Sequence, residues 1–130
     1  MTSNTNFPYH VAVWLDHESA HLFFESVLRG EGHPEKVKAH HHNHKHPTET
    51  EKNHYFQDLL KKIEVCEEIL ITGPGNAKTE FKHYLETHAP KVAEKVVGLE
   101  TLDHPTENQI RAFANKVFKA IDKRLGTCPL

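Results

Sequence analysis

Apolar residues follow two different periods along the chain, and each period predicts a different kind of element. The run at 69–71 is entirely apolar, is too short for a helix and is soon followed by glycine, which is typical of a strand buried on both faces of a sheet. Runs dense in β-forming residues predict the other strands, at 10–15, 20–25 with a continuation to Leu28, 35–40 and 95–102. The pattern therefore predicts five strands.

Apolar residues spaced three and four apart predict the helices. Phe56, Leu59 and Ile63 would share one side of a helix that we expect near 51–65. Three more helical segments are expected: one from Ala77 with Asn76 as its N-cap, a short turn at 91–94, and one that Thr106 caps and Gly126 ends. The long helices each carry an apolar stripe, so we expect them to cover the sheet.

The order of the predicted elements is β-β-β-α-β-α-β-α. Three strands joined by short turns form an antiparallel meander, and strands joined through helices lie parallel with right-handed crossovers. This is the order of a ribonuclease H-like α/β layer, a five-stranded mixed sheet with helices on its faces. Charged residues alternate along 35–40, which predicts an edge strand. We expect one domain at 10–126, with tails at 1–9 and 127–130.

Composition fits one soluble globular domain. The chain has 130 residues, 37% hydrophobic and 26% charged, and its apolar runs fall short of the roughly 18 residues of a membrane helix. The polar N-terminus lacks the basic and apolar regions of a signal peptide, so we expect a cytoplasmic protein with no membrane contact. Cys66 and Cys128 are far apart and in no metal-ligand spacing, which favours two reduced thiols.

Histidine is the unusual residue in this composition. The formal net charge is −2 with all 13 histidines neutral, so protonation near the imidazole pKa of about 6.5 would reverse its sign. Five of the seven residues at 40–46 are histidine, and imidazole is a preferred ligand of Zn²⁺ and Ni²⁺. The alternative is a solvated loop with adventitious metal affinity, and no cofactor is required. The candidate metal ligands are His40, His41, His42, His44, His46 and His54.

Three acidic residues stand near the ends of the first and last predicted strands. Asp16 follows the first strand, and Glu100 and Asp103 lie at the end of the last strand. Carboxylates at one sheet edge can hold the Mg²⁺ ions of a nuclease. The same residues also read as turn and loop formers, and we identified no carboxylate on the central strand to complete such a site. We therefore expect a protein that is not an enzyme.

The turn after the central strand can bind an anion. Gly73, Gly75 and Asn76 precede a helix whose first N–H groups are free, and Lys78 adds a positive charge. The spacing of a Walker loop is absent, and simple chain reversal is the alternative. A local basic patch for RNA is also conceivable around the histidine loop, from Lys36, Lys38, Lys45, Lys52, Lys61 and Lys62.

Two segments resemble the middle domain of the eukaryotic and archaeal class I release factors and of Pelota. They are Ile-Leu-Ile-Thr-Gly-Pro-Gly-Asn-Ala-Lys-Thr-Glu-Phe at 69–81 and Val-Gly-Leu-Glu-Thr-Leu-Asp-His-Pro-Thr at 97–106. Together with Val-Trp-Leu-Asp-His-Glu-Ser-Ala at 13–20 and the histidine loop, they resemble small bacterial single-domain proteins called "translational machinery protein". The resemblance covers 10 to about 120 and implies the ribosome or RNA as a partner. The Gly-Gly-Gln tip of the release factors is absent, so their release chemistry is not implied.

Three hypotheses follow from these observations. The first is a binding module that resembles the release-factor and Pelota middle domain and acts on or near the ribosome. The second is a metal-binding or metal- and pH-responsive protein that uses the histidine loop. The third and weakest is a divalent-metal-dependent nuclease. A homodimer is also considered, through the strand edge at 35–40 or through histidine loops that share a metal ion.

Overall fold

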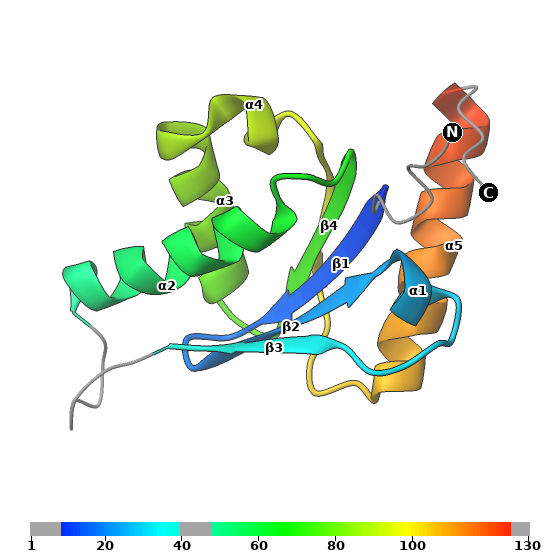
Figure 1. The fold of residues 1–130 in the computed structure, drawn as a ribbon, viewed down its shortest axis with the longest axis horizontal. Coiled ribbons are helices and arrows are strands. Elements are labelled where there is room, and N and C mark those ends of the chain that lie inside the picture. Colours follow the sequence, from blue (N-terminus) through cyan, green and yellow to red (C-terminus); the bar gives the residue numbers. More distant parts are fainter. Residues whose placement is uncertain (1–8, 40–47, 126–130) are drawn as a thin grey trace.

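A computed structural model describes residues 9–39 and 48–125, which form one mixed sheet with helices on both faces (Figure 1). The sheet has five strands in the order β3-β2-β1-β4-β5. Their bounds are β1 His10–Leu15, β2 Ser19–Phe24, β3 Glu35–Lys38, β4 Glu68–Gly73 and β5 Val96–Thr101. The predicted fold class, a five-stranded mixed α/β sheet of ribonuclease H-like type, is confirmed.

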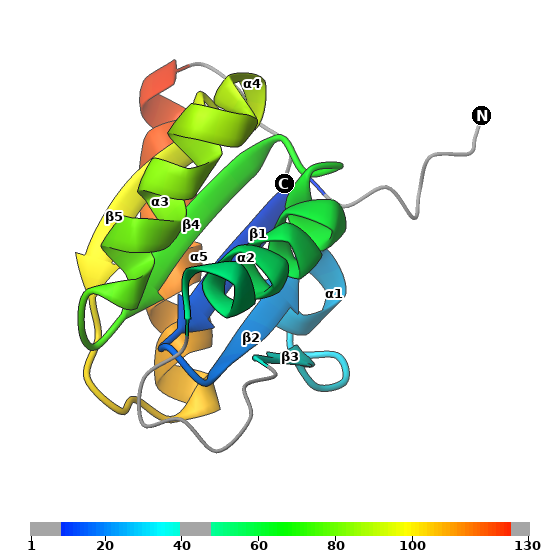
Figure 2. The same ribbon diagram turned by 90° about the vertical axis from the view of Figure 1, so that its left-hand side faces the viewer.

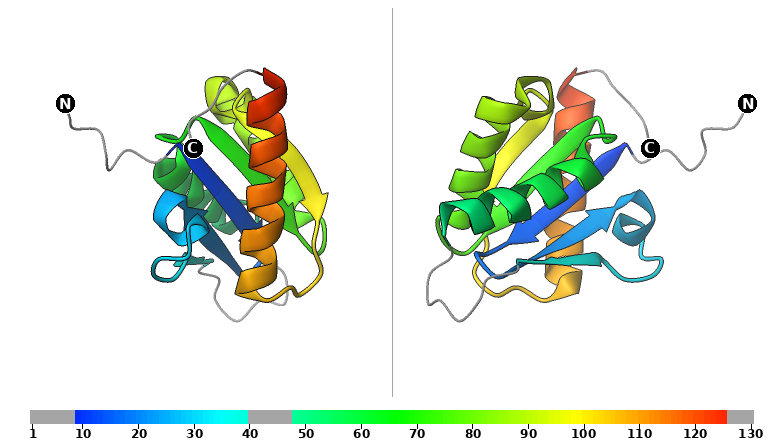
Figure 3. Two further views of the ribbon diagram at one scale, coloured as in Figure 1. Left: turned by 90° about the vertical axis from the view of Figure 1, so that its right-hand side faces the viewer. Right: turned by 60° about the vertical axis from the view of Figure 1, so that its left-hand side comes forward.

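The helices divide between the two faces of the sheet. Their bounds are α1 Glu25–Leu28, α2 Glu49–Ile63, α3 Ala77–His88, α4 Pro90–Ala93 and α5 Glu107–Leu125. Figure 2 shows α2, α3 and α4 together on one face, and Figure 3 shows α5 crossing the other face, with α1 on that side. None of the helices in the described ranges is long and apolar enough to cross a membrane.

Strand pairing follows the predicted connections. β1, β2 and β3 pair antiparallel, and β1 pairs parallel with β4, which pairs parallel with β5. All six residues of β4 are buried, as expected for a strand inside the sheet. β3 lies at an edge, where three of its four residues are exposed. The register of β1 and β4 places His10 directly opposite Glu68.

Each face of β1 contributes to a different hydrophobic core. Val11, Val13 and Leu15 point toward α2 and α3, where Phe56 and Phe81 also lie. Ala12 and Trp14 point the other way, into a second cluster with residues of α1 and α5. Successive side chains of a strand point to opposite faces. His10 therefore lies on the α5 side, at the same level as the start of β4.

The predicted continuation of the second strand to Leu28 is wrong, because residues 25–28 form the short helix α1. Val27 and Leu28 are adjacent and both belong to the cluster on the α5 side of the sheet, whereas adjacent residues of a strand point to opposite faces. Side chains of α5 also donate hydrogen bonds to the last carbonyl groups of α1: Arg111 Nε donates to Val27 O at 2.7 Å, and Asn115 Nδ2 donates to Leu28 O at 2.8 Å. Tertiary contacts with α5 thus determine that residues 25–28 form a helix and not a strand.

Capping residues explain where two helices begin. Thr48 Oγ1 accepts from Glu51 N, and Glu51 Oε1 accepts from Thr48 N, so α2 begins two residues earlier than expected. Thr106 makes the same exchange with Gln109 at the start of α5, which confirms Thr106 as its cap. The expected end of that helix at Gly126 lies outside the described residues.

Candidate functional site

The glycine turn between β4 and α3 is built for chain reversal. A Cβ at Gly73 would lie 2.2 Å from Leu15 O, so only glycine fits where the two strands end. Asn76 precedes α3 but makes no side-chain cap hydrogen bond, and the Lys78 ammonium donates to Gly75 O at 2.6 Å. Lys78, whose positive charge was expected to help bind an anion, thus makes a hydrogen bond within the turn. Anion binding by these four residues stays a prediction.

The three predicted carboxylates are placed at or after the ends of their strands. Asp16 Oδ1 accepts from Glu18 N at 2.8 Å and from Ser19 N at 2.9 Å, which is the pattern of a turn between β1 and β2. Glu100 and Asp103 are exposed. The group of possible metal ligands that occurs among the described residues contains none of the three. Their nuclease role stays a prediction that no geometry here supports.

The predicted metal loop, His40 to His46, lies outside the described residues. His54 is exposed on α2. Two lysines of the patch predicted around this loop are already paired, since Lys52 lies 3.4 Å from Glu80 and Lys62 contacts Glu35. Cys66 is buried and free, in agreement with a reduced thiol, and Cys128 is not described.

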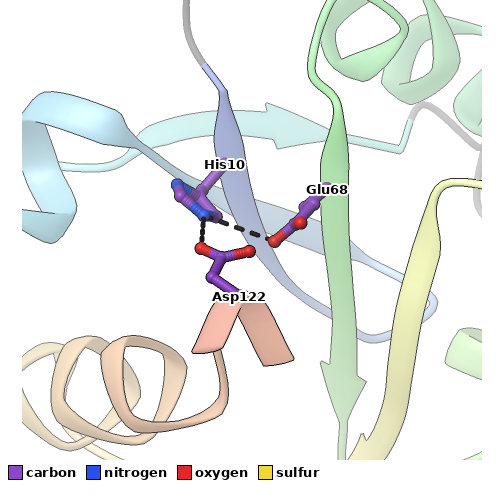
Figure 4. A group of neighbouring side chains, drawn as sticks. All are labelled: His10, Glu68 and Asp122. Carbon is purple, nitrogen blue, oxygen red and sulfur yellow. Dashed lines mark hydrogen bonds and ion pairs between the residues drawn. The ribbon is translucent and has the colours of Figure 1, made fainter. Parts of the chain in front are cut away.

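The most unusual site in the described chain is a buried group that we did not identify from the sequence. His10 begins β1, Glu68 begins β4, and Asp122 lies near the end of α5 (Figure 4). Their exposed fractions are 1%, 6% and 3%. One potential ligand atom from each lies within 4.8 Å of the others. We call these three residues the His10 cluster.

Glu25 holds the His10 ring from the opposite side. His10 Nδ1 lies 3.1 Å from Glu25 Oε1 and 3.2 Å from Oε2, and Oε1 also accepts from the backbone N–H groups of Tyr9 and His10. An ionised carboxylate only accepts hydrogen bonds, so His10 carries a proton on Nδ1 and donates this N–H to Glu25. Nε2 is thereby turned toward the two carboxylates of the cluster.

Negative charge is concentrated around Nε2. Asp122 Oδ2 lies 2.9 Å from Nε2, and Glu68 Oε1 lies 3.3 Å from it. Glu68 Oε1 is nevertheless without an aligned hydrogen-bond partner in the described part of the chain, so we regard its approach to Nε2 as electrostatic contact alone. Burial, and then the contact with the neighbouring Asp122 carboxyl group and its negative charge, raise the pKa of Glu68 to about 7, against the opposing effect of His10.

This arrangement can hold a proton or a metal cation at the centre of the group. Two oxygens and a nitrogen approach one another in a space that water barely reaches, and lone pairs at such distances repel unless a positive charge lies between them. The three side chains are almost fully buried, unlike the lining of an open pocket that binds a small molecule.

Signals of this cluster exist in the sequence but are ambiguous there. Asp122 follows Phe118 by four positions, so an acidic residue occupies the buried stripe of the last helix. Glu68 is the first residue of the central strand, and it is the carboxylate on that strand that we did not identify from the sequence. Only the register of β1 against β4 shows that His10 meets Glu68.

The described residues also line two hollows elsewhere on the surface. A groove of about 590 Å³ runs between α2 and α3, lined by residues that include Lys52, His83 and Tyr84. A smaller hollow of about 220 Å³ is lined by Trp14, His21 and other residues. Burial, with the charge of Lys36, lowers the pKa of His21. Neither hollow gathers the buried polar groups that mark the His10 cluster.

The outer side of α5 carries a stripe of positive charge. Lys116, Lys119 and Lys123 are exposed and spaced to share one side of the helix, away from the buried Phe118. None of them has an ion-pair partner among residues 9–39 and 48–123. Between 108 and 121 the helix contains no acidic residue, so this side is uniformly basic or neutral. We call these three residues the α5 lysine stripe.

Comparison with solved structures identifies proteins that share this fold. Archaeoglobus fulgidus Pelota matches with a TM-score of 0.56 at 15% identity, over 93% of this chain and 38% of that chain. Thermoplasma acidophilum Pelota matches with 0.53 at 20% identity, over 85% and 33%. The archaeal translation termination factor aRF1 matches with 0.52 at 13% identity, over 94% and 42%.

These matches concern the fold, because the identities are low. The chain spans between a third and about two fifths of the length of these proteins. The sequence matches no protein-family model, and no curated protein matches it in sequence. The expected likeness to Pelota and to the archaeal release factor is thus confirmed for the fold, while membership of the small bacterial family stays a prediction.

Proposed function

We propose that this protein is a translation-associated binding module that contacts RNA on the ribosome and has no catalytic role. The observation that carries the proposal is the fold shared with Pelota and with a translation termination factor over 85–94% of this chain. The absence of Gly-Gly-Gln from the sequence separates it from peptide release. Fold likeness alone is weak evidence for function, so a surface must support it.

The α5 lysine stripe is the surface that suits an RNA partner best. Its three ammonium groups are solvated and unpaired in the described chain, so contact with phosphates would release counterions at little cost. The patch predicted around the histidine loop is weaker, because Lys52 and Lys62 form ion pairs with Glu80 and Glu35. RNA phosphates are read here by charge, and no aromatic stacking platform accompanies the stripe.

The proposal is tested by co-sedimentation with purified bacterial ribosomes at two salt concentrations. We expect the wild-type protein to pellet with ribosomes and the variant K116Q/K119Q/K123Q to pellet less. The slope of log affinity against log salt should become shallower by about 0.7–0.9 for each phosphate that the variant no longer neutralises. The variant K36Q/K38Q/K61Q changes the net charge equally and serves as the matched control, because these lysines are also exposed.

The two variants separate the function from the surface assigned to it. Loss of pelleting in the K36Q/K38Q/K61Q variant alone would support the ribosomal role but assign the RNA contact to the lysines around the histidine loop. Wild-type protein that stays in the supernatant at low salt would contradict the proposed function itself.

A second candidate function is metal binding by the histidine loop. Its support is the density of histidine in the sequence, five in seven residues, followed by the exposed His54 in the N-terminal half of α2. Calorimetric titration with Zn²⁺ and Ni²⁺ tests it, against a protein with the five loop histidines replaced by serine. A higher whole-number stoichiometry in the wild-type protein than in the variant would support a site in the loop, and equal stoichiometry in the two proteins would reject it.

A further inference from the structure

We propose that the His10 cluster is a structural site for one divalent transition-metal ion of the Zn²⁺ class, bound by His10 Nε2 and by carboxylate oxygens of Glu68 and Asp122. This site is separate from the histidine loop and does not depend on the ribosomal role. Three elements that are far apart in the sequence supply the ligands: the first residue of β1, the first residue of β4 and the last turns of α5.

The distances suit such an ion. Ligands about 2.0–2.1 Å from a tetrahedral zinc ion lie about 3.3 Å from one another. Nε2 is 2.9 Å from Asp122 Oδ2 and 3.3 Å from Glu68 Oε1, so small side-chain shifts would open the coordination sphere. One nitrogen and two carboxylate oxygens are a donor set for Zn²⁺ and similar ions, whereas Mg²⁺ prefers oxygen ligands alone.

The surroundings of the ligands point the same way. Glu25 accepts a hydrogen bond from the Nδ1–H group of His10, so the Nε2 lone pair faces the cluster. A carboxylate in this position is the usual outer partner of a metal-binding histidine. Glu68 Oε1 is buried and has no hydrogen-bond partner in the described residues, although it is aimed at the centre of the group. A cation would satisfy this oxygen and offset the charge of the neighbouring carboxylates.

The site would act as a clamp. It would join the ends of the inner strands β1 and β4, where both begin, to the C-terminal half of α5, on the face that α5 covers (Figure 4). Binding to the folded chain but not to the unfolded chain raises stability by mass action. We therefore expect the metal to raise the melting temperature and not to support a reaction.

The test removes the competing histidines first. In the loop-serine protein, His40, His41, His42, His44, His46 and His54 are replaced by serine. This protein is stripped with chelator, unfolded and refolded with or without Zn²⁺, and the bound metal is counted. We expect about one Zn²⁺ per chain and a melting temperature that rises with Zn²⁺ concentration.

Substitution of one ligand at a time assigns the ion. Glu68→Gln and Asp122→Asn in the loop-serine protein keep the side-chain shapes and should weaken Zn²⁺ binding by more than about 100-fold, beyond the usual effect of an outer partner. Glu80→Gln is the matched control, because Glu80 also pairs with a histidine, His17, but lies outside the cluster. Circular dichroism confirms that each variant folds.

Two results would overturn the site. In the first, the loop-serine protein refolds but does not retain stoichiometric Zn²⁺. This result contradicts the site without any ligand variant. Alternatively, folded Glu68→Gln and Asp122→Asn proteins could bind Zn²⁺ as well as their parent does. In either case protons and not a metal ion hold the cluster together.

Discussion

At the scale of single residues, Glu25 organises the start of the first strand. Its Oε1 accepts from the N–H groups of Tyr9 and His10, and both of its oxygens lie within 3.2 Å of His10 Nδ1. The residue is the first of α1, so the short helix that replaces the expected strand extension is also what brings this carboxylate to the ring.

Replacement of Glu25 should weaken metal binding without abolishing it. Glu25→Gln keeps a hydrogen-bond acceptor but removes the charge that fixes the Nδ1 proton, so we expect Zn²⁺ affinity to fall about 10–100-fold at unchanged stoichiometry. Competition with a fluorescent zinc chelator measures this in the loop-serine protein. Equal affinity in the two proteins would show that Glu25 does not orient the ring.

The Cys66 thiol should be almost inert in the folded protein. Burial, followed by the negative charge of Glu25, raises its pKa to about 12, and only the thiolate reacts with alkylating agents. At pH 8 we expect alkylation on the order of 1,000-fold slower than for an exposed cysteine with a pKa of about 8.5. Mass spectrometry of a Cys128→Ser protein treated with iodoacetamide measures the rate, and urea should restore it. Fast modification without urea would contradict the buried position.

At the scale of elements, the turn between β4 and α3 shows what a glycine is needed for. Gly73 lies against the backbone of Leu15, while Gly75, two residues later, has open space around its Cα. The two glycines occur in one tripeptide and look equivalent in the sequence. Their difference comes from the end of β1, which only the folded sheet brings near.

This contrast predicts different effects of the same substitution. Gly73→Ala should lower the free energy of unfolding by about 2–4 kcal/mol, because the new methyl group overlaps Leu15 O and the strand ends must separate. Gly75→Ala should change it by less than about 0.5 kcal/mol. Urea denaturation of the two variants measures both values. Similar stabilities would mean that β1 and β4 do not approach as closely at their ends.

The elements themselves were predictable to a useful degree. β1, α2, β4 and α3 follow from short apolar runs and from helical stripes such as Phe56, Leu59 and Ile63, since burial of one side requires these periods. The segment at 25–28 was not predictable, because hydrogen bonds from Arg111 and Asn115 of α5 decide its conformation. These donors are 84 and 87 positions away, so the local sequence does not indicate them.

At the scale of the whole molecule, topology followed from connection lengths, but the site did not. Short turns gave the antiparallel meander, and helical crossovers gave the parallel strands. The His10 cluster depends on register, since a shift by one residue would turn His10 or Glu68 to the opposite face. The homodimer through β3 stays a prediction, for which the molar mass in solution is the direct measurement.

The 112 positions that separate His10 from Asp122 also bear on how the chain folds. During synthesis the sheet strands are complete before α5 emerges, and the face that holds Ala12, Trp14 and Leu70 is covered only in part, by α1, until that helix docks. Contacts between such distant positions form late and slowly. A nascent chain stalled before residue 107 would therefore present an apolar sheet face to chaperones and to other nascent chains, and release of the last helix would close it.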